Sequence, residues 1–139
     1  MEQRKLVFRL SCCKNKNIRQ VKCGGFEDID VLEVNDGAGV FADCTLLEEA
    51  DLSQTGITEL EGTFEGCSAL ETVKLPENIT KIGFGTFTGC SSLEKMDLSQ
   101  TLVTEIGGSA FSACSGLKTV KFPKTLTAID SYAFYPVKI

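Results

Sequence analysis

The sequence predicts a solenoid, mainly β with little helix, in which short strands and single helical turns stack in about five to six rungs of 23–24 residues. Three columns of residues predict it, because each column advances by 23 or 24 residues from one copy to the next. A period of this length with regularly placed leucines is typical of leucine-rich repeats. The columns are Phe41, Phe64, Phe87, Phe111 and Phe134; Cys44, Cys67, Cys90 and Cys114; and Leu47, Leu70, Leu93 and Leu117.

The main strand of each rung is predicted from the pattern Leu-x-x-Val-x-Leu. In its second copy, Val73 and Leu75 are expected to point inward, and Thr72 and Lys74 outward. A strand with one buried face requires this alternation. One rung cannot bury its own apolar face, so the copies are expected to stack and share one core.

Two further sides complete each rung. After the strand the chain turns a corner, at Pro76 and Pro123 in two rungs and at Ser-Gln-Thr (residues 53–55 and 99–101) in the other two. A second extended segment follows. The pattern Phe-x-x-Cys then predicts a single helical turn that carries both side chains on one face.

The chain is expected to form one continuous domain with two parts. Residues 1–40 are interpreted as an N-terminal cap and a degenerate first repeat, because Ile18–Cys23 has the spacing of Leu70–Leu75. A terminal repeat is expected to be atypical, since one of its sides faces water. Residues 41–139 are interpreted as regular repeats followed by a short C-terminal cap.

The repeated patterns resemble BspA-like leucine-rich repeats, also called the Treponema-type class. They read Leu-x-x-Val-x-Leu-Pro, then Ile-x-x-Ile-Gly, then Ala/Thr-Phe-x-x-Cys, and residues 81–90 and 109–123 match them best. The resemblance covers about residues 41–135, with a fainter extension back to Ile18. It implies a curved right-handed solenoid with the main strands in one sheet. Members of this family occur on bacterial surfaces and in parasitic protozoa, and some are adhesins that bind host matrix proteins.

Composition and charge exclude several classes of function. The net charge of −5 argues against nucleic-acid binding, which needs a basic surface for phosphate contacts. No apolar run has the length of a membrane span. The apolar run Leu6–Phe8 ends at Arg9 and is too short for the core of a signal peptide, so we expect a cytoplasmic protein rather than a cell-surface one.

The chain contains seven cysteines and no histidine. Without histidine, the commonest general base and the commonest zinc ligand are both absent, so we expect no enzyme, no metal and no cofactor. The cysteine column is interpreted as buried thiols where the rungs pack closely. Cys12, Cys13 and Cys23 lie outside that column and are candidates for exposed thiols.

The outward positions of the main strands form the candidate partner-binding face. One column carries charges of alternating sign: Lys22, Asp51, Lys74, Asp97 and Lys121. A second reads Glu59, Lys81, Glu105 and Ala128. Such charges either fix the register of the rungs or provide a polar surface for a partner protein, and both roles are compatible. The face predicted to bind is Glu49, Asp51, Thr72, Lys74, Lys95, Asp97, Thr119 and Lys121.

A column of threonines occupies the second extended segment of each rung: Thr58, Thr80, Thr104 and Thr127. We interpret it as stacked hydroxyls on a strand surface, where β-branched residues fit well. The alternative is an ice-binding array, but charged residues flank the column.

The sequence predicts a protein-interaction or scaffolding module that presents its outward strand face to a partner protein of unknown identity. Two alternatives stay open: a fragment of a cell-surface adhesin that binds host or matrix proteins, and a structural solenoid that stacks on itself. We expect a monomer, because basic residues and proline mark both ends of the array, at Arg4, Lys5 and Arg9 and at Pro136 and Lys138.

Overall fold

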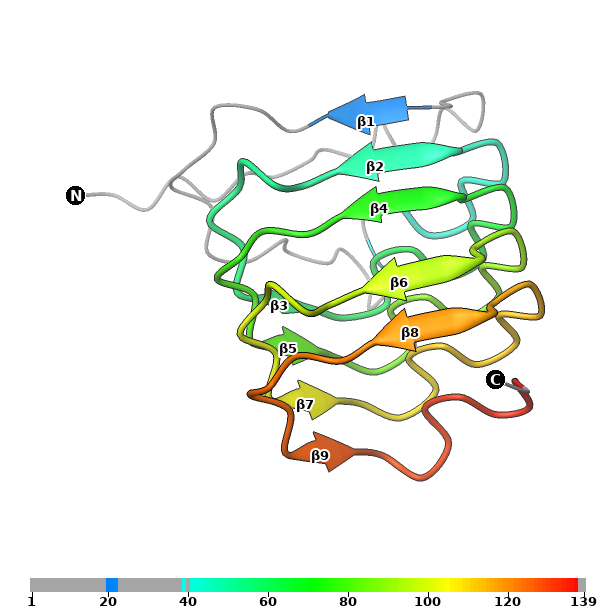
Figure 1. Ribbon diagram of the computed structural model, residues 1–139. Coiled ribbons are helices and arrows are strands. Elements are labelled where there is room, and N and C mark those ends of the chain that lie inside the picture. The colour runs from blue at the N-terminus through cyan, green and yellow to red at the C-terminus, as the bar shows by residue number, and fades with distance from the viewer. Residues whose placement is uncertain (1–19, 23–38, 40, 138–139) are drawn as a thin grey trace.

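The computed structural model describes residues 20–22, 39 and 41–137, which form two rows of short strands (Figure 1). Each complete rung contributes one strand of three residues and one of two residues, and four such rungs run from β2 to β9. The strands are β1 (Gln20–Lys22), β2 (Glu49–Asp51), β3 (Glu59–Leu60), β4 (Thr72–Lys74), β5 (Lys81–Ile82), β6 (Lys95–Asp97), β7 (Glu105–Ile106), β8 (Thr119–Lys121) and β9 (Ala128–Ile129).

Every strand pairs in parallel with the equivalent strand of a neighbouring rung, as expected when copies of one unit stack. Val73 is the register partner of Ala50, and Ala50 is the partner of Val21. The alignment of Ile18–Cys23 with Leu70–Leu75 predicts this placement of Val21. Apart from Gly39, the rest of the proposed N-terminal cap, with Cys12, Cys13 and Cys23, lies outside the described residues.

The predicted helical turn at Phe-x-x-Cys is wrong, and the described residues contain no helix. The amide of Cys90 donates to the carbonyl of Phe87, 3.1 Å away, which closes a turn of four residues. The residue before each cysteine has a positive φ, at Asp43, Gly66, Gly89 and Ala113. A left-handed residue at this point ends the helical path, so the chain makes a sharp corner.

The Phe column forms the continuous centre of the core. Consecutive rings from Phe41 to Phe134 are stacked, with centroids 5.5, 5.5, 5.2 and 5.0 Å apart. The four cysteines beside them are buried, and the thiols of the last two reach the rung before them. Cys114 Sγ lies 3.0 Å from the carbonyl oxygen of Phe87, and Cys90 Sγ lies 3.2 Å from that of Phe64. These contacts confirm that the cysteine column is structural within the described repeats.

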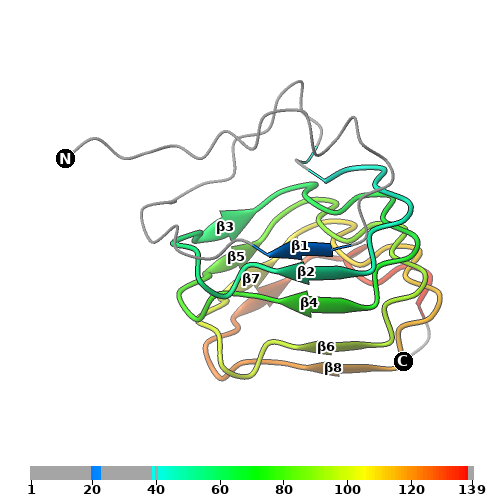
Figure 2. The ribbon, with the colours of Figure 1, turned by 90° about the horizontal axis from the view of Figure 1, so that it is seen from above.

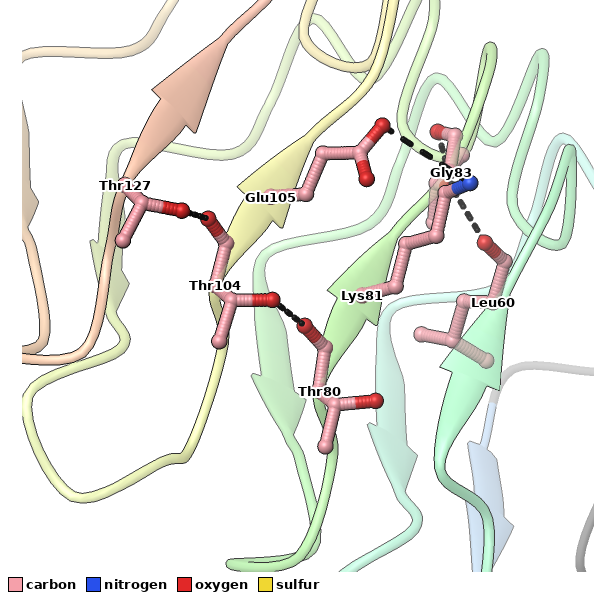
Figure 3. Close-up of polar contacts among 8 residues, drawn as sticks. Leu60, Thr80, Lys81, Gly83, Thr104, Glu105 and Thr127 are labelled. Atoms are coloured by element: carbon pink, nitrogen blue, oxygen red, sulfur yellow. Dashed lines mark hydrogen bonds and ion pairs between the residues drawn. The ribbon is translucent and has the colours of Figure 1, made fainter.

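The four short strands β3, β5, β7 and β9 form one uninterrupted sheet. Three hydroxyls of the threonine column secure it, because those of Thr80, Thr104 and Thr127 each donate to a main-chain carbonyl of the preceding rung (Figure 3). Thr104 Oγ1 lies 3.3 Å from the carbonyl oxygen of Thr80, and Thr127 Oγ1 lies 3.0 Å from that of Thr104. The hydroxyls therefore hold adjacent rungs in register.

Candidate partner-binding face

The eight residues of the predicted face lie on four main strands, and seven of them are exposed. We call this surface the strand face. Between its outward residues, Ala50 and Met96 point into the core and are buried, as the alternation of the strands predicts. The pairs are Glu49 and Asp51 on β2, Thr72 and Lys74 on β4, Lys95 and Asp97 on β6, and Thr119 and Lys121 on β8.

The predicted charge ladder is present only in part. Lys121 Nζ lies 3.8 Å from Asp97 Oδ2 across β6 and β8. No ion pair joins Lys74 to Asp97 on the neighbouring strands β4 and β6, although their charges are opposite. In the second predicted column, Lys81 Nζ lies 3.7 Å from Glu105 Oε1. A third ion pair, which the sequence reasoning missed, joins Lys118 to Glu94 at 3.1 Å. These pairs are solvent-exposed and screened by water, so they contribute little to stability.

The ladder is interrupted because the main strands do not form one sheet. Strands β1, β2 and β4 form one sheet, and β6 and β8 form another. Figure 2 shows β6 and β8 set apart from the first three strands. The expectation of a single sheet of main strands is therefore wrong. We call the opening between the two sheets the β4/β6 gap.

The joined strands show which hydrogen bonds the gap lacks. Between β6 and β8, the Glu94 carbonyl accepts from the amides of Lys118 and Thr119 at 2.8 and 3.3 Å. At the other end, the Leu98 amide donates to the Lys121 carbonyl at 2.8 Å. Strands β2 and β4 are joined by the equivalent bonds.

Across the gap the same positions are not connected. The groups equivalent to those bonded between β6 and β8 are the Glu71 carbonyl with the amides of Glu94 and Lys95, and the Leu75 amide with the Asp97 carbonyl. No hydrogen bond joins any of these groups within the described rungs. Each strand therefore presents a main-chain edge toward the gap.

The gap coincides with an alternation of two corner types. Rungs with the DLSQT corner (residues 51–55 and 97–101) have one more residue between their two strands than rungs with the proline corner (residues 75–76 and 122–123). In the DLSQT corner, Asp97 Oδ1 accepts from the Ser99 amide at 2.9 Å, and the buried Thr101 hydroxyl donates to the Leu98 carbonyl at 2.7 Å. The strands are joined where a proline corner follows a DLSQT corner, and they are open at the reverse step.

A groove of ≈ 580 Å³ lies at the gap, within the range of roughly 300–1,000 Å³ found for ligand-binding clefts. Three residues of the predicted face line it: Thr72, Lys95 and Asp97. The sequence reasoning missed its other lining residues. The alternation of DLSQT and proline corners in the sequence could have indicated the break between β4 and β6. The missed residues are Glu71, Val73, Ser92 and Glu94.

The groove offers polar recognition rather than reactive groups. Hydrogen bonds from Ser99 to the Asp97 carboxylate lower the pKa of Asp97, so it is ionised at neutral pH. Within the described rungs no cysteine lines the groove, and burial raises the pKa of Cys114 to about 12. In the described part of the chain, no three metal-ligating side chains are grouped to hold an ion. No helix in that part has the length and apolar character needed to cross a membrane.

Comparison with known proteins shows which family of repeats the sequence matches. The sequence pattern described as "BspA type Leucine rich repeat region" matches residues 11–139 in six copies. A search of curated proteins found no match. Among solved structures, a leucine-rich repeat protein from T. pallidum is 29% identical, with a TM-score of 0.68, and the match covers 86% of this chain and 54% of that one.

A leucine-rich repeat protein from Bacteroides ovatus is 25% identical, with a TM-score of 0.57. That match covers 82% of this chain and 34% of the other. The chain therefore spans about half the length of the first protein and about a third of the second.

Proposed function

Because the chain belongs to the BspA-type leucine-rich repeat family, we propose that it is a protein-interaction module without catalytic activity, which binds a partner protein through its strand face. Leucine-rich repeats generally mediate contacts between proteins, and solenoids present extended surfaces for this purpose. The adhesin and the self-stacking alternatives stay predictions.

The observation that carries the proposal is the groove at the β4/β6 gap. It lies on the strand face, and it opens at the one step between described rungs where the main strands are not joined. Asp97 lines the groove, and Lys74 lies on the opposite strand. Both side chains are exposed and form no ion pair with each other, so a partner can contact both. A continuous, fully paired ladder would leave fewer polar groups available for binding.

The test is affinity capture of partners from the source cells with wild-type protein and the variant Lys74→Glu/Asp97→Lys as baits. This variant reverses both charges at the gap and conserves the net charge. The matched control, Glu65→Lys/Lys124→Glu, also conserves net charge and changes exposed residues away from the strand face. Circular dichroism should show all three proteins folded.

We expect a partner that is captured by the wild type and by the control, and that is lost or strongly reduced with the gap variant. A partner that binds all three proteins equally would show that another surface is responsible. Loss of binding with both variants would indicate a general charge effect and would also contradict the proposal.

A further inference from the structure

The main-chain edges at the β4/β6 gap identify the kind of partner that the groove fits. We infer that the gap binds an extended polypeptide segment, which adds to the edges of β4 and β6 through main-chain hydrogen bonds. This inference rests on the proposed function and specifies the structure of the bound partner. An exposed strand edge is a template for a further strand, and many peptide-binding domains use this mode.

The groups required for such pairing are present on both sides. On the β4 side they include the Glu71 carbonyl and the Leu75 amide. On the β6 side they include the Lys95 amide and the Asp97 carbonyl. The equivalent groups of the joined strands make interstrand bonds of 2.8 to 3.3 Å, so their geometry is suited to a parallel neighbour. A bound segment would supply to each edge the partners that it lacks.

The charged residues beside the gap determine which side chains of the bound polypeptide segment would be favoured. Glu71 and Glu94 occupy equivalent positions at the start of the two strands, and both line the groove. A residue bound between them should be basic. The next outward position lies between Thr72 and Lys95, and Lys95 makes no ion pair with the described residues. An acidic residue is therefore favoured there.

The remaining positions follow from the strand pattern. Inward-pointing positions of the segment should be apolar, like Val73 and Leu75. The last outward position lies between Lys74 and Asp97, whose charges are opposite, so a neutral residue fits it best. A segment parallel to β4 should thus read leucine, lysine, aspartate, valine, serine, leucine.

The test uses this hexapeptide, acetylated and amidated at its ends, with binding to the full chain measured by isothermal titration calorimetry. One control peptide exchanges the lysine and the aspartate and so keeps the composition. A second control carries N-methyl groups on the aspartate and the valine, which removes two main-chain donors and leaves the side chains unchanged. We expect the affinity to fall at least tenfold in both controls, on the order of the loss of one or two hydrogen bonds.

Two protein variants test the location. A disulfide in Thr72→Cys/Lys95→Cys would join β4 to β6 at a strand spacing of about 5 Å and close the gap. A disulfide in Glu105→Cys/Ala128→Cys joins β7 to β9, which are already register partners away from the strand face, and leaves the gap open. Peptide mapping by mass spectrometry confirms each cross-link. The peptide should bind the β7/β9 variant equally in both redox states, whereas the oxidised form of the β4/β6 variant should bind it at least tenfold more weakly than the reduced form of the same variant does.

Three outcomes would overturn the inference: no binding of the hexapeptide to the wild type, equal binding of the N-methylated peptide, or undiminished binding when the gap is cross-linked. Binding of the natural partner shows whether this inference fails alone or the proposed function fails with it. If the partner depends on Lys74 and Asp97 but still binds the cross-linked protein, the strand face binds it without strand addition. If neither the charge reversal at Lys74 and Asp97 nor the cross-link reduces binding of the partner, the proposed function fails as well.

Discussion

The amide of Leu102 donates a hydrogen bond to the carbonyl of Glu77, 3.2 Å away, and so joins two rungs at their corners at the same step where β4 and β6 are not paired. The opening is thus confined to the main strands. The short-strand sheet and the Phe column continue past it without interruption.

This arrangement predicts a difference in hydrogen exchange among three equivalent amides. The amides of Leu52 and Leu98 donate to carbonyls of the following rung, at 2.8 Å each, whereas the Leu75 amide faces the gap. The Leu75 amide should exchange at least about tenfold faster than the other two in the native protein. Exchange followed by NMR measures all three. Equal protection of Leu75 and Leu98 would mean that the gap is closed in solution.

Truncation of the Phe column should depend on position. Phe87 is fully buried between two stacked rings, whereas Phe134, in the last described rung, is only partly buried. Phe87→Ala should lower the free energy of unfolding by about 3–5 kcal/mol, and Phe134→Ala by clearly less. Urea denaturation measures both. Equal costs would contradict a core that depends on neighbouring rungs.

Removal of one hydroxyl from the threonine column should remove one hydrogen bond between rungs and so lower the free energy of unfolding. Thr104→Val conserves shape and removes the donor to the Thr80 carbonyl, so we expect about 1 kcal/mol of destabilisation. Thr119→Val is the matched control, because Thr119 is exposed on β8 and its hydroxyl makes no hydrogen bond with any residue that the structure describes. Chemical denaturation should therefore distinguish the two variants, and an unchanged Thr104→Val protein would refute the register role.

The cysteine column should be inert in the folded state. Cys90 and Cys114 are buried, and desolvation raises the pKa of both thiols, so the reactive thiolate is scarce at neutral pH. Iodoacetamide should label these two cysteines only after unfolding in urea. Mass spectrometry reads the labelling site by site. Rapid labelling of Cys90 in the native protein would contradict its buried position.

The DLSQT corner should contribute a pH-dependent stability. Hydrogen bonds from Ser99 hold the pKa of Asp97 below its ordinary value of 3.8. A lowered folded-state pKa stabilises the protein above the unfolded value, and this contribution is lost as the pH falls through the folded value. Ser99→Ala should thus have a lower Tm than the wild type near neutral pH, and the difference should shrink as acidification protonates Asp97 in the folded protein. A difference independent of pH would exclude this mechanism.

The rungs were predictable because each column places the same type of residue at the same buried position of every copy. Phe, Cys and Leu at fixed steps are needed for stacking in register, and the burial of Phe64, Cys67 and Leu70 confirms this reasoning. The strand register was also predictable, since Val73 and Ala50 occupy the same place in their patterns.

The predicted helical turn and the single sheet were wrong for physical reasons. The turn depends on the backbone angles of Gly66 and Gly89, which a helical spacing of side chains does not reveal. The gap depends on how two corner types fit together, and that is a property of pairs of rungs. Asp97 and Lys74 therefore looked like members of one charge ladder, although they lie on different sheets.

The alternation of corners means that the true building block of this array is a pair of rungs, about 47 residues long, rather than the single repeat. Lengthening such a chain by duplication of a whole pair would reproduce the step from a proline corner to a DLSQT corner. Each added pair would then bring one more opening, spaced by about 10 Å for two strand separations. Growth by gene duplication would thus multiply docking positions along the solenoid, and a partner with repeated segments could gain avidity without any new contact chemistry.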